Sequence, residues 1–427
     1  MRARCRPVLM LLVLLLGAGP GLAAGDTSAL YMASLAAAER AAGGAGAGDG
    51  SDPMAAMRAA VNLQRLAAER AFAGDTEGAI AAYDAQAPLG PLHPPAQRLA
   101  PELDDAVAED AVEAIVAAAR TRRVVILNEA HHVPMHRAFA RALAARLRAI
   151  GYGYLACEAF AEGVPLATAM QGRGQGRVVA ATGHYLRDPV FAGFVNNALA
   201  DGWKLVAYEH IPERGVATDP WDAMGQREEG QARHLAERVF AADKEARVFI
   251  YAGYAHAYKG AQDGQRWMAE RLRRMTGIEP LSVDTTTMFA HPDRRREADP
   301  YDALVTRFPL AAPFVLRAAD GSHPVFGDAR GHVDMQVVFP RYPARDGRPD
   351  WLRTLAGRSP RAMPDELMPR RGRRIVKAYR IDDGPDAVPA DAVLVDAGKP
   401  APALMLPPGA FRFAVEDEGA ADRLSPP

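Results

Sequence analysis

Five short apolar runs, each followed by polar residues and then by a stretch with helical spacing, constrain the fold of this chain most strongly. They lie at residues 123–127, 154–157, 204–208, 247–252 and 280–283. Continuous apolar runs of this length are typical of strands that are covered on both faces of a parallel sheet. We therefore predict an α/β fold with a mostly parallel, doubly wound sheet and helices on both faces.

The stretches between these runs have apolar residues at helical spacing. We expect helices at residues 107–120, 134–150, 190–200, 227–240 and 264–275. Pro134 fits the first turn of the second helix, and Gly151 fits the position just after its end. With 49% hydrophobic residues, the chain can bury one large core, which we place in an α/β domain at residues 101–355.

The regions on either side of this domain have a different character. Residues 25–100 are Ala-rich, and residues 58–86 resemble one tetratricopeptide-type helical hairpin with Gly74-Asp75 at its turn. One hairpin cannot build a solenoid, so it either packs on the main domain or offers a surface to a protein partner. Five prolines at residues 88–101 indicate a linker.

Short β-like runs dominate the last part of the chain. Those at residues 314–317 and 335–339 are expected to extend the main sheet. Those at residues 375–381, 392–395 and 411–415 are expected to form a small β-rich C-terminal extension, residues 356–427.

The first 24 residues have the pattern of a signal peptide. Arg2, Arg4 and Arg6 precede an apolar run at residues 8–16, and small residues follow up to Ala24. We therefore expect an exported, periplasmic protein with no membrane span after cleavage. Only Cys157 would remain, which excludes an intramolecular disulfide.

Charge and motifs exclude several classes of function. The net charge of −1, lowered by three on cleavage, gives no electrostatic footprint for nucleic acid. There is no Gly-x-Ser-x-Gly, Walker A or Gly-x-Gly-x-x-Gly motif after a strand. His132 and His136 have the spacing of a metalloprotease helix but lack the Glu between them.

Ionisable residues follow all five predicted strands. They are Glu129 with His131, Glu158, Glu209 with His210, His256, and Asp284. The carboxyl ends of parallel strands lie along one edge of a sheet, so these side chains are expected to converge there. Glu209 and Asp284 could equally cap a helix or pair with an arginine, and His210 could lie in a solvated loop.

Two chemistries suit this set. His131, Glu158, His256 and Glu209 could hold a divalent metal ion that activates water. Without a metal, a histidine oriented by Glu129 could act as a general base. Both lead to hydrolysis of an ester or amide bond in a small molecule or peptide.

Other candidates are weaker. His132 is expected at a helix start, and Cys157 as a packed thiol. His184 and Tyr185 could cover the site or lie in an exposed loop.

The segment Asn128-Glu129-Ala130-His131, the Arg-rich stretch after it, Glu158 and Gly253-Tyr254-Ala255-His256 resemble the erythromycin-esterase/ChaN-like superfamily, which includes TraB/TIKI-type proteases. Arg227-Glu228 also resembles the family's helix before the second His turn. The resemblance covers residues 105–285. Asn128 stands where the family usually has Gly, and Asn retains some tolerance of positive φ.

This resemblance implies His131, Glu158 and His256 as the core of a catalytic site, supported by Glu129. It also implies two alternative functions, hydrolysis and haem binding, because the family includes esterases and metal-dependent proteases as well as haem-binding proteins. The first hypothesis is an exported hydrolase. The alternative is a haem- or iron-binding protein of metal uptake, with Tyr152, Tyr154 or Tyr208 as an axial ligand and with Tyr208, His210 and His184 as cofactor-binding residues.

Overall fold

The computed structural model describes residues 30–44, 53–87, 103–171, 176–213, 215–262 and 264–419. The predicted signal peptide and the predicted linker at residues 88–101 lie outside the described residues.

The described residues form an eight-stranded mixed sheet with the order β1-β7-β8-β6-β2-β5-β3-β4. Six neighbouring strands, from β8 to β4, run parallel, and β7 runs antiparallel to both β8 and β1. The strands are β1 (Val107–Asp110), β2 (Val124–Glu129), β3 (Tyr154–Cys157), β4 (Lys204–Ala207), β5 (Val248–Gly253), β6 (Leu281–Met288), β7 (Phe314–Arg317) and β8 (Met335–Val338). The predicted α/β class, the five predicted strands and the two added strands are confirmed.

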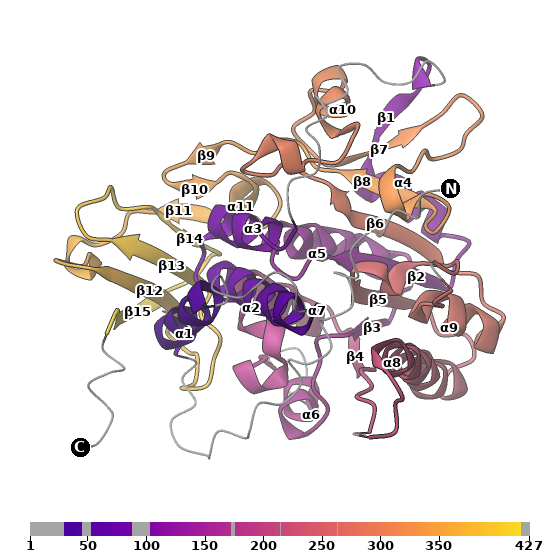
Figure 1. Cartoon of the computed structure of the whole chain (residues 1–427), viewed down its shortest axis with the longest axis horizontal. Coiled ribbons are helices and arrows are strands. Elements are labelled where there is room, and N and C mark those ends of the chain that lie inside the picture. The colour runs from indigo at the N-terminus through magenta and orange to yellow at the C-terminus, as the bar shows by residue number, and fades with distance from the viewer. Residues whose placement is uncertain are drawn as a thin grey trace.

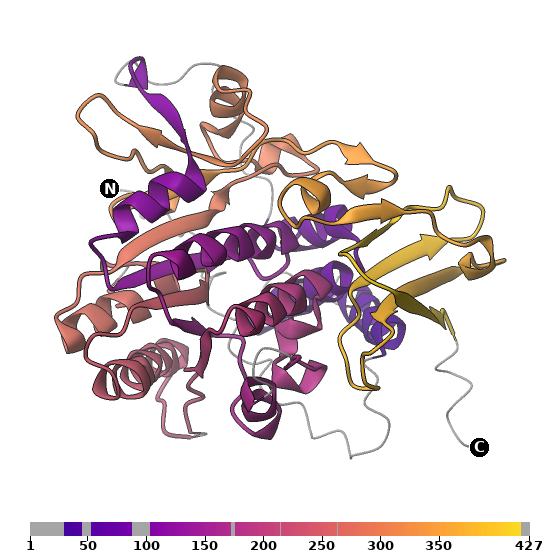
Figure 2. The same ribbon diagram turned by 180° about the vertical axis from the view of Figure 1, so that it is seen from behind.

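Helices cover both faces of this sheet (Figures 1 and 2). On β2, Val125 and Leu127 pack in a core with α4, α5 and α7, whereas Val124 and Ile126 pack in a core with α8 and α9. This alternation follows from the two-residue period of a strand. The helices around the main sheet are α4 (Ala111–Ala119), α5 (Pro134–Ala149), α6 (Val164–Gln171), α7 (Pro189–Ala200), α8 (Pro220–Leu235), α9 (Met268–Thr276), α10 (Tyr301–Arg307) and α11 (Trp351–Thr354).

Four predicted boundaries are wrong by four residues or more. The helix expected from residue 264 begins at Met268. The helix expected from residue 107 begins at Ala111, because residues 107–110 pair with β7 and the Asp110 side chain caps α4 by accepting from Glu113 N at 3.0 Å. Helix α8 begins seven residues before the expected start, after Asp219 as N-cap and Pro220. Strand β6 continues to Met288, so Asp284 lies within the strand and not at its end.

The N-terminal helices are α1 (Tyr31–Gly44), α2 (Pro53–Phe72) and α3 (Thr76–Asp84). Helices α2 and α3 form the predicted hairpin. Gly74 has φ 76°, and a β-carbon there would lie 2.2 Å from the carbonyl oxygen of Ala392. Only glycine therefore fits this turn.

The remaining strands belong to three small antiparallel sheets, β10-β9, β11-β14 and β13-β12-β15. They are β9 (Ala344–Arg345), β10 (Arg348–Pro349), β11 (Ser359–Arg361), β12 (Arg373–Arg380), β13 (Asp391–Asp396), β14 (Leu404–Leu406) and β15 (Phe411–Asp417). We call the last of the three, β13-β12-β15, the C-terminal sheet.

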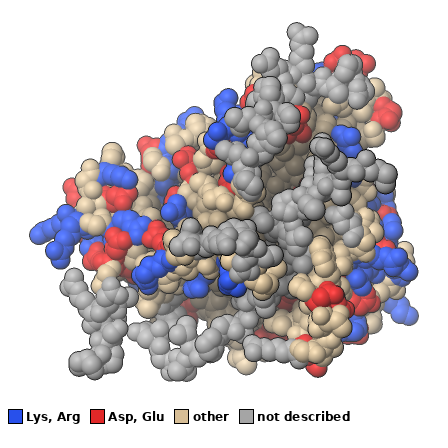
Figure 3. Space-filling view, viewed as in Figure 1, with Lys and Arg blue, Asp and Glu red and all other residues tan. Residues whose placement is uncertain are grey.

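The N-terminal helices pack on the C-terminal sheet. Tyr31, Leu35 and Phe72 share a buried core with Ile375 and Ala392. Charged side chains reinforce this contact, because Arg373 donates to both carboxylate oxygens of Glu39 at 2.8 and 2.7 Å. Figure 3 shows blue and red side chains interspersed over this part of the surface.

In the part of the chain that the structure describes, no helix combines the length and the apolar character needed to cross a membrane.

Candidate functional site

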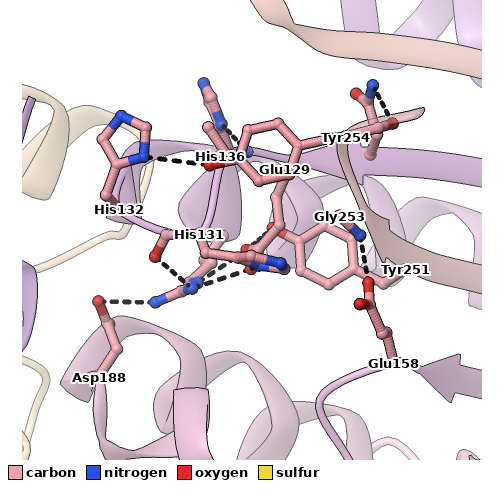
Figure 4. A network of polar contacts seen from close by, with 12 residues as sticks. Glu129, His131, His132, His136, Glu158, Asp188, Tyr251, Gly253 and Tyr254 are labelled. Carbon is pink, nitrogen blue, oxygen red and sulfur yellow. Dashed lines mark hydrogen bonds and ion pairs between the residues drawn. The ribbon is translucent and has the colours of Figure 1, made fainter. Parts of the chain in front are cut away.

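Four of the five predicted strand ends come together at the carboxyl edge of the main sheet. Glu129 at the end of β2 is paired in register with Gly253 at the end of β5. Glu158 directly follows β3, and its backbone N–H donates to Tyr251 O at 3.1 Å. His131 and His256 follow β2 and β5 within three residues. These side chains are buried, and Figure 4 shows Glu129, His131 and Glu158 close to one another.

Glu129 is the centre of the first of two polar networks. Its carboxylate accepts from Arg137 Nε and Nη2 at 2.8 and 2.9 Å and from the Tyr251 hydroxyl at 2.7 Å. His131 Nδ1 lies 2.8 Å from the same carboxylate. Arg137 also contacts Asp188 at 3.0 Å and donates to His131 O at 2.8 Å. The guanidinium therefore fixes both the carboxylate and the turn that carries His131.

Burial alone would raise the pKa of Glu129, but the charge of Arg137 and the hydrogen bonds from Arg137 and His131 outweigh it and lower the pKa. Glu129 is therefore a carboxylate at neutral pH. A carboxylate that accepts from Nδ1–H of His131 leaves the Nε2 lone pair of the ring as its basic position.

The second network is built around Arg227 of α8. Its Nη2 donates to Glu158 and Glu209, both at 2.5 Å, and its Nε donates to Glu209 at 2.9 Å. Its Nη1 lies 3.0 Å from His256 Nε2. On the other side of the imidazole, His256 Nδ1 lies 2.7 Å from Glu228.

Burial tends to lower the pKa of His256, but Glu228 and Glu158 outweigh it and raise the pKa to about 10. Burial tends to raise the pKa of Glu158, whereas His256 and Arg227 lower it well below its ordinary value. Three carboxylates thus surround two cations in this network. The raised pKa favours the protonated form of His256 at neutral pH, and the expected role of this residue as a metal ligand or base stays a prediction.

Gly253 is the point where the two networks meet. Its N–H donates to Glu158 Oε2 at 2.6 Å. A β-carbon on Gly253 would lie 2.5 Å from His131 Nε2 and 3.2 Å from Glu158 Oε2. His131 Nε2 is itself buried and has no hydrogen-bond partner among the described residues. The absence of a side chain at Gly253 is what lets His131 approach Glu158.

Aromatic rings cover this meeting point. Tyr185 is stacked on His131 with 4.2 Å between ring centroids, and Tyr254 meets the same imidazole edge-on at 5.3 Å. Tyr254 has φ 42°, which is unusual for an aromatic residue and marks a constrained turn. On the far side of Tyr254, Tyr83 of α3 is stacked on His132 at 4.0 Å.

A cavity of about 650 Å³ opens beside this cover. Glu158, Arg227, Glu209 and Tyr185 belong to its wall. His131 does not line the cavity and lies behind the ring of Tyr185. A molecule in the cavity would therefore be next to Glu158 and Arg227, and one aromatic ring away from His131.

The expected divalent metal stays a prediction, and a cation of the protein itself lies among the proposed ligands. Arg227 donates to Glu158 and Glu209 and faces His256, so a permanent cation occupies the place between three of the four expected ligands. Among the described residues, no group of three or more His, Cys, Asp and Glu side chains is arranged to hold a metal ion.

The expected cofactor-binding residues are scattered. Tyr152 and Tyr154 lie at the amino end of β3, the opposite edge from Glu158, and donate to Arg122 O at 2.8 Å and to Asp243 at 3.1 Å. Tyr208 is buried and donates to Tyr251 O at 3.3 Å.

His184 and His210 do line the cavity. The ring of His210 lies against Gly230, where a β-carbon would be 2.1 Å from its Cγ. Haem binding stays a prediction.

Two residues singled out from the sequence, Asp284 and Asn128, make contacts that join strands. Asp284 is a structural residue, because its carboxylate accepts from Asn128 at 2.9 Å and from Gln336 at 2.9 Å. Asn128 does not have positive φ; its side chain accepts from Thr285 N at 2.7 Å and donates to Tyr254 O at 3.0 Å, which joins β2 to β6 and to the His256 turn.

The site also contains residues that the strand-end pattern does not indicate. Arg137, Tyr251 and Glu228 are fully or almost fully buried partners of the predicted residues. Tyr251 left a signal, because its hydroxyl interrupts an apolar run two residues before the strand ends. No feature of the sequence distinguishes Arg137 from the other arginines of its helix.

Comparisons with known proteins add little to this geometry. No family model matches the chain, and a search of curated proteins found no match. Among solved structures, the type III effector HopBA1 is similar over 46% of this chain and 95% of its own, with 14% identity and a TM-score of 0.29. A bacterial protein toxin is similar over 60% of this chain and 56% of its own, with 13% identity and a TM-score of 0.32.

Proposed function

We propose that the protein hydrolyses ester or amide bonds with His131 as the general base. The observation that carries the proposal is the state of this imidazole. Its Nδ1 is held by a fixed carboxylate, and its Nε2 is buried, unpartnered among the described residues, and next to Glu158. A histidine oriented in this way is the arrangement that accepts a proton from an attacking water.

The neighbouring groups have matching roles in the proposal. Water between His131 Nε2 and Glu158 would be the nucleophile. The protonated His256 and Arg227 would supply positive charge next to the bond under attack, where charge develops on the carbonyl oxygen. No step requires a metal, because Arg227 takes the central position.

Charge narrows the class of substrate. The two networks contain the carboxylates Glu129, Glu158, Asp188, Glu209 and Glu228 and the cations Arg137, Arg227 and His256. Carboxylates therefore exceed cations by two. An excess of negative charge repels anions, so the proposed substrate is a neutral or positively charged ester or amide.

Access requires movement of Tyr185. The substrate would enter the cavity beside Glu158, and the ring of Tyr185 would have to turn away from His131 before the bond could reach Nε2. The expected cover over the site is thus a part of the proposed mechanism.

The test is turnover of neutral and cationic esters and peptides by the full chain, with and without a chelator. His131→Ala and Glu129→Gln should each lower turnover about 100-fold or more, the size of a general-base contribution. His323→Ala is the matched control, because His323 contacts Leu316 O away from the site. Equal turnover in His131→Ala and wild type would contradict the proposal, and loss of activity on chelation would contradict the metal-free mechanism.

A further inference from the structure

A second cavity, of about 310 Å³, lies between the main sheet's helices and the loops of the C-terminal part. Helices α5 and α7 form one side, and residues 387–390 and 407–408 form the other. Figure 2 shows α5 and α7 reaching from the main sheet toward the C-terminal sheet. No residue of the Glu129 or Arg227 network lines this cavity. It is therefore separate from the proposed hydrolytic site.

Arginines dominate its wall. Among the described residues that line it, Arg141, Arg177, Arg358 and Arg380 are basic and Asp383 alone is acidic. We call this space the arginine cavity. Arg177 lies 3.8 Å from Asp383, and the same carboxylate accepts from the backbone N–H of Arg380 at 2.9 Å. One carboxylate cannot balance four guanidinium groups, so the lining carries an excess of three positive charges.

Arg358 is buried, and the surrounding backbone fixes its position. Only 6% of the residue is exposed, and its guanidinium donates to Ala390 O at 2.8 Å and to Pro189 O at 2.9 Å. Asp391 lies 3.6 Å away, but it already accepts two hydrogen bonds from Arg348 at 2.9 and 3.0 Å. Carbonyl oxygens hold the position of Arg358, and the one carboxylate of the described residues within 4 Å of its guanidinium is shared with Arg348.

The other arginines are held in the same manner. Arg141 Nη1 donates to Ala356 O at 3.3 Å, and Arg380 Nη1 donates to Pro408 O at 3.1 Å. Burial lowers the pKa of Arg358, the charges of Asp391 and Asp188 oppose this effect, and the charges of Arg348 and Arg141 add to it.

Binding of an anion in a cavity of this kind lowers the free energy of the system. Guanidinium groups bind phosphate and carboxylate oxygens through paired N–H donors. These hydrogen bonds are stronger when the groups are partly shielded from water. An excess of three charges suits a dianion better than a single carboxylate. We propose that the arginine cavity binds a phosphate group, either as free phosphate or on a phosphorylated molecule such as an anionic lipid.

The experiment measures phosphate binding by the full chain. Inorganic phosphate is titrated calorimetrically, with chloride at the same ionic strength as the reference. Arg141→Gln and Arg380→Gln should each weaken binding about tenfold or more, since each removes a charge-assisted hydrogen bond to the anion. Arg146→Gln is the matched control, because Arg146 lies on the same helix α5 but pairs with Glu113 at the surface.

Arg177→Gln provides a second variant, since half of this side chain is exposed and its loss does not endanger folding. A parallel arm uses sedimentation with phosphatidylcholine vesicles, with and without phosphatidic acid. Binding that is lost in the cavity variants supports the proposal in either arm, and the arm identifies the carrier of the phosphate. Absence of binding in both arms, or equal binding by the cavity variants and Arg146→Gln, overturns it.

Discussion

At the scale of single residues, Glu129 determines the state of the candidate site. It accepts from Arg137, Tyr251 and His131 at once, so neither the carboxylate nor the imidazole is free to rotate. The sequence indicated the Glu129–His131 pair because both residues interrupt an apolar run. It could not indicate Arg137, since a buried guanidinium on a helix has the same pattern as an exposed one.

Arg137→Ala should lower the free energy of unfolding by about 3–5 kcal/mol, because it leaves Glu129 and Asp188 buried without their counterion. Arg146→Ala, on the exposed side of the same helix, should change it by less than about 1 kcal/mol. Urea denaturation of both variants measures the difference. Similar losses in the two variants would show that Arg137 is not a buried counterion.

Gly253→Ala should abolish most of the proposed turnover while the fold is retained. The new β-carbon would lie 2.5 Å from His131 Nε2 and would displace the imidazole from Glu158. Gly153→Ala is the control, since a β-carbon there meets nothing within 4 Å just before β3. The measurement is turnover together with the circular dichroism of each variant. Unchanged turnover in Gly253→Ala would mean that the approach of His131 to Glu158 has no role.

At the scale of elements, the short 3₁₀ helix η6 (His184–Arg187) connects the N-terminal helices to the site. Tyr185 points to His131, whereas Arg187 pairs with Glu69 of α2 at 3.0 Å and its guanidinium lies over the rings of Tyr31 and Phe72. The N-terminal helices therefore hold the segment that covers the site. A surface for a protein partner on the same hairpin stays a prediction.

Removing the aromatic cover should expose the buried imidazole. In Tyr185→Ala, modification of His131 by diethylpyrocarbonate should become several-fold faster, as followed by mass spectrometry of the peptide. Tyr258→Ala is a matched control, since Tyr258 is stacked on His332 at 5.1 Å and should expose that histidine instead. No change in the His131 rate would exclude Tyr185 as the barrier.

The sequence predicted helices and strands well where the apolar pattern is strong. It predicted them less well where pairing with a distant strand determines the structure. The strands at residues 154–157 and 314–317 were predicted at their observed bounds, because turn residues flank short apolar runs. Residues 107–110 were assigned to a helix because their spacing matches one. Their pairing with β7, about 200 residues later in the chain, has no local signal.

At the scale of the whole molecule, acidic and alkaline pH are expected to destabilise the fold through different histidines. Burial lowers the pKa of His136 to about 3 and that of His184 to about 4, so the unfolded chain binds more protons than the folded one as the pH falls below about 6.5. The raised pKa of His256, about 10, has the opposite effect, and its stabilisation is lost as the pH rises from about 6.5 to 10.

We therefore expect maximal stability near pH 6.5, with the denaturation midpoint falling on both sides. In His256→Gln the alkaline decline should flatten, while the acid decline should persist. Denaturation midpoints from pH 4 to 10 check this. A wild-type stability that is constant from pH 6.5 to 9 would contradict a charged, stabilising His256.

The contact between the two ends of the chain has a consequence for biosynthesis. Glu39 of α1 and Arg373 of β12 are 334 residues apart, yet they pair directly. A ribosome therefore releases the N-terminal helices long before their partner strands exist, and distant contacts of this kind slow folding. The N-terminal helices, which hold the segment that covers His131, can therefore dock on the C-terminal sheet only after its strands have been synthesised.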